Sequence, residues 1–146
     1  MRILILSLMV SLSALCLGAN AFAGSFVCVS GSLFKPDGGD VYVGQGGCET
    51  AKIFGNIACV AGNVYLANGS SNYVGHAACS KAQMSPAFAC VNSQLFHSSG
   101  WSQFVGSSCT NALLTNEYAC VGGVLYRADG SFNTVGTQGC ASLTPR

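Results

Sequence analysis

The segment CVAGNVYLANGSSNYVGHAAC, from Cys59 to Cys79, decides the fold because the chain contains it four times in variant form. The other copies begin at Cys28, Cys90 and Cys120, so that successive copies start 31, 31 and 30 residues apart. All four follow the pattern C-V-x-[GS]-x-[LV]-[FY]-x-x-[DNS]-G-x(4)-V-G-x(2,3)-C. Self-similarity at a fixed period indicates a repeat architecture, in which neighbouring units bury each other's apolar faces.

Each copy predicts three short strands separated by turn residues. The first strand surrounds the first cysteine and has apolar residues on both faces, since neighbouring strand residues point to opposite sides. A tight turn is indicated by Gly31, Gly62, Ser93 and Gly123. The second strand stops at a pair suited to a hairpin turn: Asp37-Gly38, Asn68-Gly69, Ser99-Gly100 or Asp129-Gly130. The third strand stops at Gly44, Gly75, Gly106 or Gly136. Each copy is therefore predicted to be a three-stranded meander.

The fold class that follows is all-β, with four tandem disulfide-linked meanders covering residues 26–55, 56–86, 87–116 and 117–146. Two arrangements fit the pattern. We favour a closed, propeller-like array of four units, because an open stack normally needs polar terminal caps. Its crowded centre would be lined by Val27, Ala58, Ala89 and Ala119. The alternative is a short β-solenoid or rod. The connectors between copies are expected to be either short helical turns or extended crossings.

The cysteines predict a disulfide framework. One of the nine, Cys16, falls in the N-terminal leader described below, and the other eight come two to a copy. Pairing within each copy predicts the bridges Cys28–Cys48, Cys59–Cys79, Cys90–Cys109 and Cys120–Cys140. Bridges between neighbouring copies, such as Cys48–Cys59, are the rival. A zinc site is disfavoured because the eight contain no C-x-x-C pair.

The N-terminus predicts export. Arg2, an apolar run from Ile3 to Leu17 and the sequence Ala21-Phe22-Ala23 have the layout of a secretory signal peptide, residues 1–23. A lipoprotein reading of Cys16 is weaker, because Leu15 is bulky where that processing needs a small residue. The mature chain, 24–146, is predicted to be one β-repeat domain without a membrane span, secreted or periplasmic. Without Arg2 it has five basic and five acidic residues, which leaves no positive field for nucleic acid.

No catalytic set, metal site or cofactor is predicted. His76 and His97 occupy different repeat positions and are interpreted as surface residues. Asp37 and Asp40 are only a weak calcium candidate, since Asp37 is already explained by the turn.

Aromatic residues remain as binding candidates. Trp101, the single tryptophan, follows a turn glycine and is the candidate binding residue, although folding back over its own sheet is the favoured interpretation. Two repeated aromatic columns are expected in the core because every unit needs the same packing. They are Phe34, Tyr65, Phe96 and Tyr126, and Tyr42, Tyr73 and Phe104.

These observations favour an exported, non-enzymatic module that binds a glycan or an extracellular or envelope protein. Repeated loops on one face would give it several weak sites, whose avidity adds up. Two alternatives remain, an inhibitor of an extracellular hydrolase and a structural envelope component.

Overall fold

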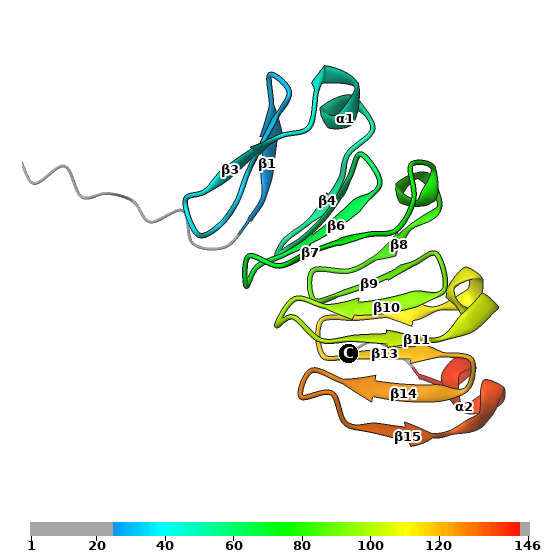
Figure 1. Ribbon diagram of the computed structural model, residues 1–146. Helices are drawn as coiled ribbons and strands as arrows, with labels where there is room; N and C mark the ends of the chain where they lie inside the picture. Colours follow the sequence, from blue (N-terminus) through cyan, green and yellow to red (C-terminus); the bar gives the residue numbers. More distant parts are fainter. Residues whose placement is uncertain (1–24, 144–146) are drawn as a thin grey trace, which may run out of the picture.

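The computed structural model describes residues 25–143, so the predicted leader, 1–23, lies outside the described residues. Four antiparallel sheets follow one another along the chain and stand in an open row (Figure 1). The all-β prediction, with one disulfide-linked unit per repeat, is confirmed.

The strands are short and every sheet has the chain order. The first sheet comprises β1 (Val27–Val29), β2 (Ser32–Phe34) and β3 (Asp40–Tyr42), and the helix α1 (Gln45–Glu49) follows it. The second comprises β4 (Lys52–Phe54), β5 (Ile57–Val60), β6 (Asn63–Leu66) and β7 (Ser71–Tyr73), followed by the 3₁₀ turn η1 (Ala78–Lys81). The third comprises β8 (Gln83–Met84), β9 (Phe88–Val91), β10 (Gln94–His97) and β11 (Ser102–Phe104), followed by η2 (Gly106–Asn111). The fourth comprises β12 (Leu113–Leu114), β13 (Tyr118–Val121), β14 (Val124–Arg127) and β15 (Phe132–Thr134), followed by α2 (Gly136–Ala141).

The connectors between copies contain a helical turn and then an extended segment, the two forms that the sequence predicts as alternatives. A helical turn contains the second cysteine of each copy, and in the first three copies a short strand follows it. That strand, β4, β8 or β12, pairs with the first strand of the next copy, as in Lys52 opposite Cys59 and Gln83 opposite Cys90. Three strands per sheet is therefore right for the first sheet, whereas the other three sheets have four.

Two consecutive residues with positive φ close the first hairpin of every copy. In the second copy these are Ala61 (φ 48°) and Gly62 (φ 79°), and in the third Asn92 (φ 45°) and Ser93 (φ 69°). This backbone is that of a type I′ turn, whose twist matches that of the flanking strands. The turn predicted from the small residue in this column is confirmed.

All four disulfides join the cysteines within one copy, as predicted. The pairs are Cys28–Cys48, Cys59–Cys79, Cys90–Cys109 and Cys120–Cys140, with Cα–Cα distances of 5.3–5.5 Å. They fix the helical turn to the first strand of the same sheet. Four such bridges indicate that the protein folds in an oxidising compartment.

The core consists of three layers, each between two successive sheets. Phe26 and Leu33 of the first sheet pack with Ala58 and Val60 of the second. The second and third sheets share a layer that includes Ile57, Val64, Ala89 and Phe96, and the third and fourth share one that includes Phe88, Leu95, Val121 and Tyr126. None of these three clusters joins the first sheet to the fourth. The closed array is therefore wrong, and the open alternative is the one that forms.

The alternation of side chains along each strand explains the row. One face of each sheet points to the sheet before, and we call it the preceding face. It carries the residues just before and after the first cysteine and the aromatic residue of the second strand. The other face points to the sheet after, and we call it the following face. It carries the residue two before the first cysteine and the Leu or Val of the second strand. Ala58 and Ala89 thus lie between successive sheets, and Val27, expected at a closed centre, is 46% exposed.

Candidate functional site

The most regular exposed feature is a row of aromatic side chains along one edge of the stack. Tyr42, Tyr73 and Phe104 end the strands β3, β7 and β11, and their side chains are 76%, 64% and 70% exposed. Each of these strands is the last in its sheet, and Figure 1 shows them along the same side of the molecule. We call these three residues the aromatic row. The expectation that this column is core was wrong.

The place of the row on the edge strands explains why it is exposed. Tyr42 lies opposite Ser32, Tyr73 opposite Asn63 and Phe104 opposite Gln94. These strands are edge strands with a neighbour on one side only, which places this register position at the margin of the buried layer. The other aromatic column, on the second strand, is buried at Phe96 and Tyr126, half-buried at Tyr65 and exposed only at Phe34 in the first sheet. Residues of the second-strand column also have polar partners on the edge strand, such as Ser71 opposite Tyr65. That column is more covered because its strand is central and its other partner is a small apolar residue, such as Ala58 or Ala89.

The rings of the row have local support. An ideal Cβ on Gly31 would lie 3.1 Å from Cε2 of Tyr42, so the tyrosine ring lies against a turn glycine. Tyr73 packs edge-on against His76, with ring centroids 5.8 Å apart. Stacked sheets are spaced by about 10 Å. An interval of that order is expected between the rings of successive sheets.

The row changes in the fourth copy. Thr134 occupies the equivalent position, and an exposed aromatic residue, Phe132, stands two residues earlier in the same strand. Phe132 packs against Tyr126, with ring centroids 5.9 Å apart. The edge therefore carries aromatic side chains over all four sheets, but the last is displaced along its strand.

Polar uncharged side chains accompany the row on the same edge strands. Asn72, Gln103 and Asn133 lie at the centres of β7, β11 and β15, and Ser71 and Ser102 begin two of these strands. Amides and hydroxyls both donate and accept hydrogen bonds. An aromatic face combined with such groups suits a ligand that has apolar faces and hydroxyl edges.

Trp101 does not join the row. It is half-buried, its Nε1–H donates to the carbonyl oxygen of Ala128 at 3.0 Å, and it packs with Phe88 and Tyr126. The indole thus braces the turn of the third sheet against that of the fourth. Its binding role stays a prediction, and its polar atom already has a partner within the protein.

The two histidines differ in burial. His76 is exposed, as expected, whereas His97 is 6% exposed and its interpretation as a surface residue was wrong. His97 points to the fourth sheet, at the position where the second copy has the buried Leu66. Burial lowers the pKa of the His97 imidazole from its ordinary value. The Ser99 N–H donates to Nδ1 at 3.1 Å, which favours the neutral ring.

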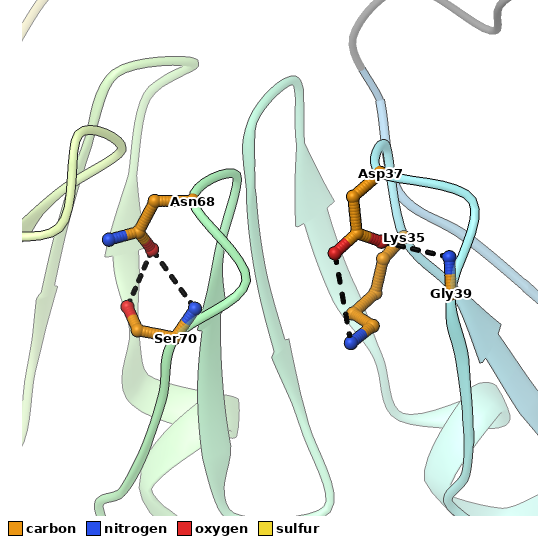
Figure 2. Close-up of polar contacts among 5 residues, drawn as sticks. All are labelled: Lys35, Asp37, Gly39, Asn68 and Ser70. Atoms are coloured by element: carbon orange, nitrogen blue, oxygen red, sulfur yellow. Dashed lines mark hydrogen bonds and ion pairs between the residues drawn. The ribbon is translucent and has the colours of Figure 1, made fainter.

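The turn tips form a second repeated feature. Asp37 Oδ1 accepts a hydrogen bond from the Gly39 N–H at 2.8 Å, and Asn68 Oδ1 accepts one from the Ser70 N–H at 3.0 Å (Figure 2). Lys35 Nζ lies 4.0 Å from the other carboxylate oxygen of Asp37. In the fourth copy the Ser131 hydroxyl and N–H lower the pKa of Asp129. These side chains are therefore engaged in building turns.

The tips supply no metal ligand cluster. Within residues 25–143, no group of three or more His, Cys, Asp and Glu side chains is placed to hold a metal ion. Of the weak calcium candidate, Asp37 lies within the hairpin turn, whereas Asp40 begins β3.

Shallow grooves lie between successive helical turns, which are the segments that contain the second cysteine of each copy. The larger has a volume of about 570 Å³ and runs between η2 and α2, where Ser108, Asn111, Gly123 and Thr137 contribute to its lining. A groove of about 450 Å³ lies between η1 and η2 and includes Lys81 and Asn92. Both are open to solvent and lined by a mixture of polar and apolar residues, and neither contains an aromatic side chain or a carboxylate among its lining residues.

No family model, no curated protein sequence and no solved structure matches this chain. Among the described residues, no helix has the length and apolar character needed to cross a lipid bilayer.

Proposed function

We propose that this protein is an exported, non-enzymatic binding module whose aromatic row takes up an extended, uncharged glycan. The observation that carries the proposal is the exposure of Tyr42, Tyr73 and Phe104 at equivalent positions of three successive sheets. Exposure of an aromatic side chain to water is unfavourable, and its burial against a ligand therefore contributes favourable free energy to binding. Three of them in line along a rigid stack favour a ligand that is itself a repeating chain.

The chemistry of the edge supports a sugar ligand over an ionic one. Sugar rings present C–H faces that pack on aromatic rings and hydroxyls that hydrogen-bond to amides such as Asn72 and Gln103. The sequence, with near-equal numbers of acidic and basic residues, gives no strong field for a charged polymer. The spacing of about 10 Å between stacked sheets is comparable to the length of a disaccharide.

Rigidity supports the proposal as well. Each edge strand is part of a sheet closed by a disulfide within the same copy. A preformed row loses little conformational entropy on binding, and three weak contacts on one polymer combine into a useful avidity. Export is supported by the predicted leader and by the four disulfides.

Sedimentation with insoluble polysaccharides, such as cellulose, chitin and cell-wall glycan, tests the proposal, with affinity electrophoresis in soluble glucans for weaker ligands. The oxidised wild-type protein is expected to be retained by at least one of them. Tyr73→Ala should weaken retention several-fold, since one stacked aromatic contact is worth about 1 kcal/mol.

Phe54→Ala is the matched control, because Phe54 is a 49% exposed aromatic residue on β4, at the opposite edge of its sheet. It should leave retention unchanged. Equal loss in both variants, or no retention of the folded wild type on any neutral glycan, would contradict the proposal. Screening the same preparation against secreted hydrolases tests the inhibitor alternative.

A further inference from the structure

The preceding face of the first sheet is bare in the described part of the chain. Val27, Val29 and Phe34 are 46%, 52% and 46% exposed. Their counterparts in the other sheets are buried or half-buried against the sheet before. These counterparts are Ala58, Val60 and Tyr65; Ala89, Val91 and Phe96; and Ala119, Val121 and Tyr126. The first sheet thus carries half of an inter-sheet interface without the other half.

The following face of the fourth sheet is the other half. Tyr118 and Leu125 are half-buried, and Val135 is 39% exposed. The counterparts in the second copy, Ile57, Val64 and Val74, are buried against the third sheet. Side chains of the same kinds and register positions therefore lie less covered at this end of the stack than anywhere within it.

We propose that a second copy of the chain stacks its first sheet on the fourth sheet of this one, repeating the interface that joins successive sheets within the chain. Each of the three internal layers pairs a following face with a preceding face. The two end faces are one of each kind. A contact between unlike faces is heterologous, which gives a ring where the rotation between copies closes and an open assembly where it does not. The sheets within one chain form an open row, so continuing the same contact gives an open, growing assembly with a free face at each end.

Charge agrees with this pairing. Arg127, exposed on the following face of the fourth sheet, corresponds to Leu66, which packs in the same layer as Phe96. Phe96 corresponds to Phe34 of the first sheet, and Phe34 lies opposite the exposed Asp40. If two copies stack with the internal geometry, Arg127 of one copy lies in the same layer as Phe34 of the next, and Asp40 is the cross-strand neighbour of Phe34.

The assembly has a consequence for the edge of the stack. The aromatic row would continue from copy to copy, and the number of rings presented to one polymer would increase with the number of copies. The assembly itself does not depend on a glycan, and its test uses none.

Sedimentation velocity and light scattering of the exported, oxidised protein across a range of concentrations test the proposal. Intact mass first establishes the N-terminus and the four bridges. The wild type is expected to give an open series of oligomers whose mean size increases with concentration. Val29→Lys on one face and Val135→Lys on the other should each give a folded monomer, because both positions are exposed. Gln103→Lys, an exposed position on the third sheet, is the matched charge control and should assemble as the wild type does.

Mixing gives the sharper result. Val29→Lys keeps an intact fourth sheet and Val135→Lys keeps an intact first sheet, so an equimolar mixture of these two monomers should form a dimer and nothing larger. A wild type that stays monomeric at every concentration, with all bridges formed, overturns the proposal whether or not residues before Gly24 are retained. A closed dimer that persists in Val135→Lys overturns it too, since that result means two like faces pair.

Discussion

The indole ring of Trp101 lies nearly parallel to the imidazole of His97, with centroids 5.4 Å apart and an interplanar angle of 11°. Phe88 contacts both rings, and the group lies between the third and fourth sheets. An aromatic residue on a turn tip thus closes over a buried histidine. The stability of the last interface should therefore depend on the protonation of that histidine.

The free energy of unfolding should decrease as the pH falls from 7.5 to 5. Burial lowers the pKa of His97 in the folded state, so the unfolded chain takes up a proton first. The stability is full above the ordinary histidine pKa of about 6.5 and is lost as the pH falls from there through the folded-state pKa. Urea denaturation at several pH values measures the slope.

His97→Leu is the control for this slope, because the second copy already has the buried Leu66 at that position. It should flatten the pH dependence between 7.5 and 5, whereas His76→Gln, at an exposed position, should keep it. An unchanged slope in His97→Leu would assign the effect to other groups.

Replacement of Trp101 should destabilise the protein even though the side chain begins at a turn. Trp101→Ala removes the stack on His97 and the bond to Ala128, and we expect a loss of about 3 kcal/mol, the low end for an aromatic residue truncated to alanine. Trp101→Phe keeps most of the packing and should cost about 1 kcal/mol, the worth of the lost hydrogen bond. Chemical denaturation compares the two. Little loss in Trp101→Ala would contradict the inference that the indole braces the third sheet against the fourth.

The disulfide of the second copy should contribute more than that of the first. Both bridges close loops with a sequence separation of 20, which predicts the same entropic term of about 3 kcal/mol. Cys59 and Cys79 are buried in the layer between the second and third sheets, whereas Cys28 and Cys48 are half-buried. Cys59→Ala/Cys79→Ala should therefore lower the urea midpoint further than Cys28→Ala/Cys48→Ala. Equal midpoints would show that burial of the bridge adds nothing.

Much of the fold could be predicted because it is local. The hairpin turns depend on two or three residues, and the bridges close within one copy, so the pattern from Cys59 to Cys79 contains both. The pairing of β4 with β5 was missed because the strand is only three residues long and lies outside that pattern. The choice between open and closed arrays depends on the angle between whole sheets, which no single column of residues determines.

The candidate site was partly visible in the sequence. Tyr42 and Tyr73 were recognised as a column, but an aromatic column serves a core or a surface equally well. The two columns differ in the place of their strand: Tyr65 lies on a central strand opposite Ala58, whereas Tyr42 and Tyr73 lie on edge strands with one neighbour, and this placement comes from the structure. Burial of His97 was missed for a similar reason, because its column also contains lysine, leucine and arginine.

The second position of the type I′ turn should tolerate serine in one copy and not in another. Gly62 has φ 79°, and an ideal Cβ there would lie 2.9 Å from the carbonyl carbon and oxygen of Gly75, which are backbone atoms that cannot easily move. Gly62→Ser should therefore cost at least about 2 kcal/mol in the free energy of unfolding, from left-handed strain and the clash together. Ser93 already occupies this position in the third copy at φ 69°. In Ser93→Gly, relief of about 1 kcal/mol of strain is offset by the larger conformational entropy of glycine in the unfolded chain, so the stability should change by less than about 1 kcal/mol. Urea denaturation of the two single variants measures these changes. A loss below about 1 kcal/mol in Gly62→Ser would contradict the prediction, because the second turn would then accept serine as the third does.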